Sequence, residues 1–393
     1  MGDGTGVRTG PLAGLRVIEL AGIGPGPFCA MMLADAGADV LRIDRPDPSG
    51  LGLDLPPRFD VCGRSRRSVA LDLKHPDAIA CLLDLLAGAD ALIEGFRPGT
   101  TERLGLGPDR CLAANPRLVY GRVTGWGQEG PLAGAAGHDL DYIALSGALH
   151  AIGPAGGAPV PPLNLVGDYG GGGMLLAFGM AAALAHAART GTGQVVDAAM
   201  VDGASTLMAM FHGLRAAGLH GEARGTNLLD GGAPHYATYA CRDGLRIAVA
   251  PIEAKFRRVL AERLGLPPES FDEWADPATW PEASTRLATI FAGRDRAAWC
   301  ELLEGTDACV APVLTMAEAA GHPHALARAA FAEVGGIVQP APAPRFSATP
   351  SSPPTPTEAP GASTRAALLD WDIPQARIDA LLAVGAAGAR QPA

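Results

Sequence analysis

Two short glycine-flanked segments carry the side chains best suited to proton transfer. His138 and Asp139 lie in AAGHDLDY, and His138 is the only histidine of the sequence that a carboxylate follows directly. Asp168 lies in NLVGDYGGGG, where an apolar stretch begins. Imidazole and carboxyl groups are common general acids and bases of enzymes. Each residue also has an ordinary interpretation, because a single histidine is often structural and an acid at a helix start is often an N-cap.

The glycines behind Asp168, at positions 170–173, are unfavourable inside a helix. Their presence indicates that another group approaches the backbone closely at this point. A helix that begins here would also present backbone N–H groups to a developing oxyanion. Glu253 begins another predicted helix much further along, where an ordinary first-turn acid is equally consistent with the pattern.

Basic residues follow the ends of several predicted strands. They are Arg45 after 40–43, Lys74 after Leu71-Asp72-Leu73, Arg97 within EGFRPG, and Arg103. Ligands meet open α/β sheets at the carboxyl ends of the strands, and an arginine there can hold a phosphate with two N–H donors. In an acidic chain these cations indicate a focused anion site, although each one taken alone is also consistent with a solvated surface.

The composition excludes several classes of protein. The 393 residues are 48% hydrophobic, which suffices for two domains with large cores. With 31 basic and 41 acidic residues the net charge is −10, which argues against a nucleic-acid partner. The motifs G-x-x-x-x-G-K-[ST], H-E-x-x-H and G-x-S-x-G do not occur, nor does a zinc-type spacing of cysteine and histidine.

The cysteines and the apolar runs predict a cytoplasmic protein. The seven cysteines are scattered without a C-x-x-C pair, as expected of reduced thiols. The opening MGDGTGVRTG lacks the apolar region of a secretory signal. The longest apolar run, 174–188, is short for a bilayer span and typical of a buried helix, so we expect no membrane partner.

The order of the predicted elements indicates an α/β fold. Short apolar strands at 15–20, 40–43, 91–93, 117–124 and 194–198 alternate with helical patterns, of which 28–36 and 78–86 are the clearest. Such alternation predicts a parallel sheet with crossover helices. A loop running into a long buried helix is expected over 167–188, and a helix over 201–217.

A glycine-rich linker at 221–234 precedes a second region. Strands within 238–250 flank a turn at Asp243-Gly244 and are followed by helical patterns. These patterns cover 253–264, 280–291 and 297–303. The proline-rich stretch 340–364 is predicted to be extended, and 365–382 is weakly helical.

The turn after the first strand, Gly22-Ile-Gly24-Pro-Gly26-Pro27, invites a dinucleotide interpretation, with Asp44 twenty residues beyond Gly24. Pro27 replaces the third glycine of that fingerprint, and the prolines remove N–H donors that a pyrophosphate would use. A Rossmann-like unit without a bound dinucleotide is therefore favoured over a nicotinamide oxidoreductase.

Long ordered motifs resemble the family III CoA-transferase superfamily, and within it the α-methylacyl-CoA racemase branch. The opening run GLRVIELAGIGPGPFCAMMLADAGADVLRIDRP carries the first part of the resemblance. It continues through EGFRPGTTERLGLGP, TGWGQEGP, AGHDLDYIALSGALHAIG, PPLNLVGDYGGGG, GTGQVVDAAMVDG, LLDGGAPHYATYACRDG and PIEAKF. The match extends from about Leu12 to about Ser351 and leaves out the last forty residues.

The resemblance implies a fold and an assembly. It implies a large Rossmann-like, CoA-binding domain over 1–220, completed by 330–393, and a small α+β domain over 230–325. It also implies an interlocked homodimer in which the large domain of one subunit faces the small domain of the other. Glu253 would then approach His138 across the subunit boundary. No metal or organic cofactor is implied, since coenzyme A is part of the substrate.

The resemblance further implies an acyl-CoA thioester substrate that is epimerised at C2. His138 and Asp168 match the catalytic pair, and Glu253 matches a glutamate that orients the histidine. The matched CoA contacts are Arg45, Leu71, Asp72, Leu73, Lys74, Gly95, Phe96, Arg97, Arg103, Gly137, Asp139, Leu140, Asp141 and Tyr142.

Inversion next to a thioester requires one base on each face of a planar enolate, and each base needs a pKa near the working pH. The pKa of the His138 imidazole needs only a small shift. The pKa of the Asp168 carboxyl must be raised, most simply by apolar burial. The closest rival is a true CoA-transferase of the same superfamily, in which Asp168 attacks the thioester and forms a mixed anhydride. A catalytically silent CoA-binding or scaffold protein is the alternative from a different class.

Overall fold

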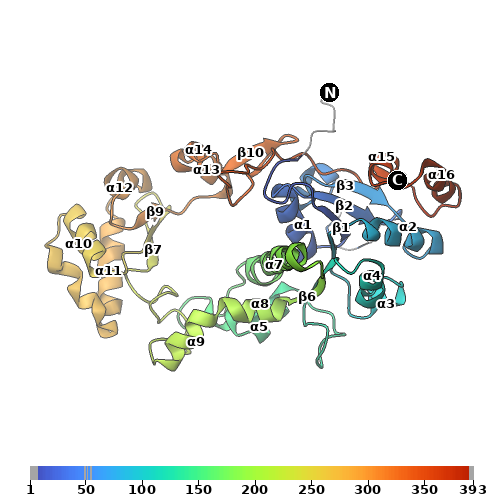
Figure 1. Cartoon of the computed structure of the whole chain (residues 1–393). Coiled ribbons are helices and arrows are strands. Elements are labelled where there is room, and N and C mark those ends of the chain that lie inside the picture. Colours follow the sequence, from blue (N-terminus) through green and yellow to red (C-terminus); the bar gives the residue numbers. More distant parts are fainter. Residues whose placement is uncertain (1–7, 48–49, 51, 54, 389–393) are drawn as a thin grey trace. The chain divides into compact units, whose positions relative to one another are not determined.

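The computed structural model describes residues 8–47, 50, 52–53 and 55–388 as two compact units (Figure 1). The large unit takes the chain up to residue 146, then 163–207 and the chain from 324 onward. The small unit takes 147–162 and 208–323. Relative to the domain boundaries expected from the sequence, 147–162 and 208–220 lie with the small unit.

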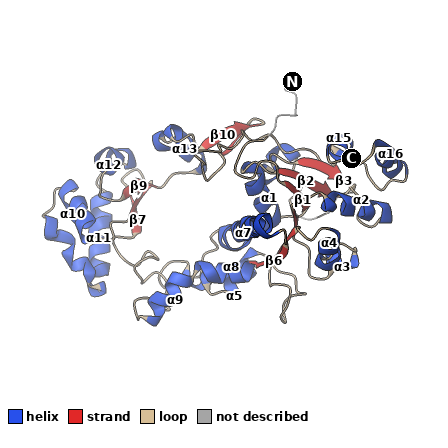
Figure 2. Cartoon of the chain, viewed as in Figure 1, coloured by secondary structure: helices blue, strands red, loops and turns tan. Residues whose placement is uncertain are grey.

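The large unit is organised by a parallel sheet of six strands in the order β3-β2-β1-β4-β5-β6. Figure 2 shows β1, β2 and β3 of this sheet side by side. The strands are β1 (Arg16–Leu20), β2 (Asp39–Asp44), β3 (Arg67–Ala70), β4 (Ala91–Glu94), β5 (Val119–Thr124) and β6 (Gln194–Ala199). β4 and β5 are buried along their whole length, as expected of central strands covered on both faces, and this burial includes the polar side chains Glu94 and Arg122. The predicted parallel α/β fold is thus confirmed. The strand order reverses between β1 and β4, where such sheets bind ligands.

Alternate residues of the strands serve two cores, one on each face of the sheet. Ile18 and Leu20 belong to the first core, and Val17 belongs to the second. The first core is closed by α2 (Pro76–Ala87), α4 (Pro108–Ala114), α15 (Thr364–Asp370) and α16 (Gln375–Ala383). The second is closed by α1 (Pro25–Asp35) and α7 (Leu175–Thr190). The large unit also contains α3 (Thr100–Arg103), α5 (Asp139–Leu145), α8 (Met200–Leu207), most of α14 (Pro323–Ala327), and a hairpin of β10 (Phe331–Val334) and β11 (Ile337–Pro340).

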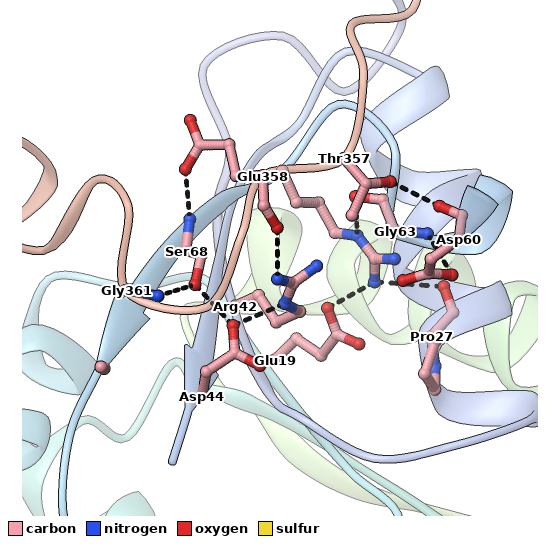
Figure 3. Close-up of polar contacts among 12 residues, drawn as sticks. Glu19, Pro27, Arg42, Asp44, Asp60, Gly63, Ser68, Thr357, Glu358 and Gly361 are labelled. Atoms are coloured by element: carbon pink, nitrogen blue, oxygen red, sulfur yellow. Dashed lines mark hydrogen bonds and ion pairs between the residues drawn. The ribbon is translucent and has the colours of Figure 1, made fainter. Parts of the chain in front are cut away.

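The C-terminal segment covers the free edge of the sheet. Three backbone N–H groups in β3 or just before it donate hydrogen bonds to the C-terminal segment. Ser65 donates to the carbonyl of Thr355 at 3.0 Å, Ser68 to Glu358 Oε2 at 2.8 Å, and Ala70 to Thr364 Oγ1 at 3.0 Å. Figure 3 shows Ser68 and Glu358 side by side. These acceptors, two side chains and one backbone carbonyl, replace the neighbouring strand that an exposed edge would otherwise recruit from another molecule. The proline-rich stretch is non-helical, as predicted, and this is its structural role.

A helical run from Leu165 to Thr190 corrects the loop that was expected to open the segment 167–188. A π-helix, η3 (Leu165–Met174), leads directly into α7. The run is long and apolar enough to cross a membrane by length and composition, yet half of its most apolar window is buried inside the large unit. The glycines at 170–173 therefore lie within a helix.

The small unit is an α+β structure around an antiparallel sheet. The sheet contains β7 (Ala237–Ala240), β8 (Arg246–Val249) and β9 (Val310–Pro312). Its helices are α6 (Ala148–Ala151), α9 (Ala209–Ala216), α10 (Ala254–Arg263), α11 (Trp280–Phe291), α12 (Arg296–Leu303) and α13 (Met316–Gly321). Tyr239, Phe271, Trp274, Phe291 and Trp299 form an aromatic centre in its core. The helix expected over 201–217 is broken at Met208, where α9 begins in the small unit.

Candidate active site

Asp168 lies where the chain leaves β1 and enters α1. A Cβ built on Gly24, the residue before α1, would be 3.3 Å from Asp168 Oδ2. Gly24 has φ 70°, a left-handed conformation that glycine adopts without strain. The carboxyl group thus sits at the carboxyl end of β1, beside the point where the strand order reverses.

Close backbone packing explains the glycines of η3. A Cβ on Gly203 of α8 would lie 1.9 Å from the carbonyl oxygen of Gly171. A Cβ on Gly172 would meet Pro25 at 2.8 Å, and one on Gly173 would meet Phe28 at 2.7 Å. The approaching groups inferred from the sequence are therefore α8 and α1. Their contact holds Asp168 in the first turn of a π-helix, a conformation that is rare and frequent at functional sites.

Two hydrogen bonds fix Asp168. Asn164 Nδ2 donates to Asp168 Oδ2 at 3.0 Å, and the backbone N–H of Asp168 donates to Asp139 Oδ1 at 2.7 Å. That N–H is consequently committed and does not serve as a donor to a substrate oxygen. Sequence reasoning missed Asn164, whose four-residue spacing from Asp168 becomes informative only when both are placed in one helical turn.

Burial raises the pKa of Asp168 above its usual range. The Asn164 hydrogen bond opposes this rise, the negative charge of Asp139 adds to it, and the charge of His138 opposes it. A carboxyl whose pKa is raised by apolar surroundings is suited to exchange protons closer to neutral pH.

His138 is exposed and directly precedes α5. Its backbone N–H donates to Asp141 Oδ2 at 3.0 Å, which fixes the start of the helix. Because the charge of His138 acts on Asp168, the structure brings the two predicted bases into one electrostatic environment. Tyr142 stabilises the same segment. Its hydroxyl donates to the carbonyl of Gly137, and its ring packs edge-on against Trp126 with the ring centroids 4.8 Å apart.

Glu253 belongs to the small unit, where it is exposed and precedes α10. Its carbonyl accepts from the backbone N–H groups of Phe256 and Arg257, as expected at a helix start. Its assignment as the acid that orients His138 stays a prediction.

The matched CoA contacts divide into exposed and buried groups. Arg45, Lys74, Gly95, Arg97, Arg103, Leu140 and Asp141 are exposed, and Asp72, Leu73, Phe96 and Gly137 are half-buried. Leu71, Asp139 and Tyr142 are buried. The side chains of Leu71 and Tyr142 fill the two cores, so a CoA contact at either position would involve backbone atoms.

Asp44 has a structural role that removes it from the dinucleotide interpretation. Its Oδ2 accepts from Arg42 Nε at 2.7 Å and from Ser68 Oγ at 2.5 Å, as Figure 3 shows. Arg42 belongs to β2, as Asp44 does, and Ser68 belongs to the neighbouring strand β3. The nearby Glu19 and Arg66 form a fully buried ion pair. Among the residues that the structure describes, no group of three His, Cys, Asp or Glu residues gathers as a metal site.

The fold is that of an α/β protein with a doubly wound sheet, and Asp168 lies beside the switch point of that sheet. Residues 12–364 match the model of CoA-transferase family III. A crystal structure of a CAIB/BAIF family protein from Brucella suis superposes with a TM-score of 0.79 at 26% identity, covering 93% of this chain and 100% of that one. The chain belongs to CoA-transferase family III.

Both racemases and a CoA-transferase are similar to this chain over most of its length. The chain is 45% identical over 343 residues to α-methylacyl-CoA racemase of Mus musculus, covering 87% of this chain and 88% of that protein. The corresponding figures for α-methylacyl-CoA racemase of Homo sapiens are 44%, 345 residues, 87% and 88%. The beta subunit of succinyl-CoA–L-malate CoA-transferase from Chloroflexus aurantiacus is 32% identical over 391 residues, covering 89% of this chain and 91% of that protein.

Proposed function

We propose that this chain is a racemase that interconverts the 2R and 2S forms of 2-methyl-branched acyl-CoA thioesters. The observation that carries the proposal is the pairing of His138 with Asp168, a carboxyl whose pKa burial raises, at the switch point of the sheet. The 44–45% identity to the mouse and human α-methylacyl-CoA racemases supports the same substrate class.

The reaction is a transfer of one proton from one face of C2 to the other. One base removes the C2 proton, and the electrons of the broken C–H bond pass to the thioester oxygen to give an enolate. The opposite base, already protonated, then delivers its proton to the other face, and the thioester re-forms. The roles of His138 and Asp168 exchange when the opposite enantiomer is bound. Asn164 holds the carboxyl of Asp168 and Asp139 holds its backbone N–H during both steps.

The CoA portion would be held by cations at the strand ends. Arg45 follows β2 and Arg97 follows β4, and both side chains are exposed and free to meet phosphate. Arg45→Ala is expected to weaken binding of CoA thioesters with little change in kcat at saturation. Unchanged affinity, measured by calorimetric titration with CoA, would remove Arg45 from the site.

We extend the proposal to a homodimer in which Glu253 of one subunit orients His138 of the other. Large apolar side chains exposed on the large unit support an extensive subunit contact, among them Leu145, Met174, Phe178 and Leu207. We propose that no metal or organic cofactor takes part. The seven free cysteines support a reducing, cytoplasmic compartment.

A CoA-transferase is the second candidate, because the chain also resembles the Chloroflexus aurantiacus transferase subunit. In that reaction the Asp168 carboxylate attacks the thioester carbonyl and displaces the CoA thiolate, giving a mixed anhydride. Such a step requires a second carboxylic acid to accept the CoA. The racemase requires none.

The two candidates are separated by incubation with one enantiomer of a 2-methylacyl-CoA in heavy water without an acceptor acid. The racemase incorporates deuterium at C2 and produces both enantiomers. A transferase shows turnover only when a second carboxylate is added. Absence of exchange across a panel of branched thioesters would refute the proposed function.

A further inference from the structure

The side chain of Asp139 turns into the protein at the start of α5. It is only 6% exposed, although His138 before it and Leu140 after it are exposed. Its Oδ1 accepts the 2.7 Å hydrogen bond from the backbone N–H of Asp168. One carboxylate therefore joins the segment that carries one predicted base to the segment that carries the other.

The backbone of η3 lies close to Asp139 at this hydrogen bond. A Cβ on Gly167 would lie 2.5 Å from Asp139 Oδ1 and 3.2 Å from the Asp139 carbonyl oxygen. A side chain at position 167 would therefore displace the Asp139 carboxylate, and the glycine allows α5 and η3 to meet at Asp139.

The burial of the second carboxylate oxygen of Asp139 is energetically unfavourable. Asp139 Oδ2 is buried and has no hydrogen-bond partner among the described residues. A buried polar atom without a partner is unfavourable, and an asparagine could make the same hydrogen bond to the Asp168 N–H. The two side chains differ in charge, so substitution by asparagine separates the role of the charge from that of the hydrogen bond.

We propose that Asp139 is a positioning residue, which locks the Asp168 backbone to the start of the His138 helix and keeps a negative charge facing the Asp168 carboxyl. The proposal rests on the proposed racemase function. It replaces the expected role of the Asp139 side chain as a CoA contact. The carboxylate is buried against the backbone of the second base and not presented at the surface where Arg45 and Arg97 lie.

The charge has a defined effect because few groups act on Asp168. These are the imidazole of His138, the carboxylate of Asp139, the hydroxyls of Tyr142 and Tyr169, and the amide of Asn164. Of these, the Asp139 carboxylate is the group whose negative charge opposes ionisation of Asp168. Its removal should let Asp168 ionise at lower pH.

The test compares Asp139→Asn with Asp139→Ala in the full-length protein. The asparagine keeps an acceptor for the Asp168 N–H but removes the charge. We expect its kcat at the optimum to stay within about 3-fold, while the acid limb of the kcat–pH profile moves to lower pH. The alanine removes the acceptor as well, and we expect kcat to fall about 10- to 100-fold with KM within about 3-fold, because small displacements of catalytic groups are costly. Asp109→Ala, at an exposed first-turn acid of α4, is the matched control and should behave as wild type.

Three results would overturn the proposal. A raised KM with unchanged kcat would make Asp139 a CoA ligand. An acid limb of the kcat–pH profile that does not move in Asp139→Asn would show that the charge of Asp139 does not influence Asp168. A loss of kcat in Asp139→Ala that matches the loss of folded protein in a thermal melt would make the residue merely structural.

The pKa of Asp168 separates this inference from the proposed function. It is measured directly by carbon-13 NMR of protein labelled at aspartate, with Asp168→Asn used to assign the signal. A lower pKa in Asp139→Asn supports the inference even if the wild type fails to epimerise thioesters, and an unchanged pKa overturns it even if the wild type is an active racemase.

Discussion

Asn164 Nδ2 and Asp168 Oδ2 are joined by a hydrogen bond of 3.0 Å across the first turn of η3. This amide N–H stabilises the ionised carboxylate and so opposes the two influences that raise its pKa, burial and the charge of Asp139. Asn164 and Asp139 therefore shift the pKa of Asp168 in opposite directions. The balance of these two effects sets the pH range in which the carboxyl can both accept and donate a proton.

Asn164→Leu should raise the pKa of Asp168, because burial and Asp139 are then unopposed by a donor. The acid limb of the kcat–pH profile should move to higher pH, the reverse of the shift expected for Asp139→Asn. At neutral pH we expect kcat to fall about 10-fold, the size of effect that one acid–base group with a mismatched pKa produces. An acid limb identical to that of the wild type would show that the hydrogen bond does not control Asp168.

Gly24→Ala should impair catalysis more than folding. The new Cβ would lie 3.3 Å from Asp168 Oδ2, and the residue must keep φ 70°. The strained backbone should cost about 1 kcal/mol of stability. Gly14→Ala is the matched control, because Gly14 has φ 86° with nothing near its Cβ position. Both variants should lose similar stability in urea denaturation, but only Gly24→Ala should lose kcat. Equal kcat in the two variants would contradict the placement of Asp168.

The small unit should lose stability in mild acid because of His235. This histidine is buried, stacks on Trp274 at 5.7 Å, and has no partner at Nδ1 among the described residues. Burial, with a smaller contribution from the Arg257 charge, lowers the pKa of His235 to about 4. Between its unfolded value and about 4, the unfolded chain binds the proton more tightly, so stability decreases as the pH falls from 6.5 towards 4.

His235→Phe should remove this acid sensitivity. The wild type is expected to lose on the order of 2–3 kcal/mol between pH 7 and pH 4, whereas the variant should lose less. Tryptophan fluorescence reports on the small unit through Trp274, Trp280 and Trp299, and the Trp126 and Trp371 signals of the large unit are removed by substitution with Phe in both proteins. Urea midpoints that change with pH by the same amount in both proteins would refute the assignment.

Glu358 should stabilise the edge of the large sheet. Its Oε2 accepts from the backbone N–H of Ser68 at 2.8 Å and its Oε1 accepts from Ser363 Oγ at 2.8 Å. Glu358→Ala would leave the fully buried Ser68 N–H unpaired, at a cost of about 1–3 kcal/mol. Glu333→Ala, at an exposed position of β10, is the control and should change stability by less than about 0.5 kcal/mol. Equal unfolding midpoints for the two variants would show that the C-terminal cover is not held by this carboxylate.

Local patterns predicted the elements that position the site. The apolar run of β1, the glycine turn and the helix of α1 follow from residues close in sequence, as does the strand that ends at Asp44. The π-helix was not predictable, because its glycines are accounted for by contacts with α8 and α1 that become visible only in three dimensions. The cover of β3 was missed for the same reason: Ser68 and Glu358 are 290 positions apart. His138 and Asp168 were identified from their motifs, whereas the internal orientation of Asp139 leaves no trace in the sequence pattern.

The placement of one base on each face of C2 is tested most directly by deuterium wash-in with single enantiomers. His138→Ala and Asp168→Ala are each incubated with the pure 2R and the pure 2S thioester in heavy water, and exchange at C2 is scored without regard to inversion. We predict that each variant loses epimerisation and exchanges only one enantiomer, and that the two variants exchange opposite ones. Exchange of the same enantiomer by both variants, or full epimerisation by either, would contradict the two-base account.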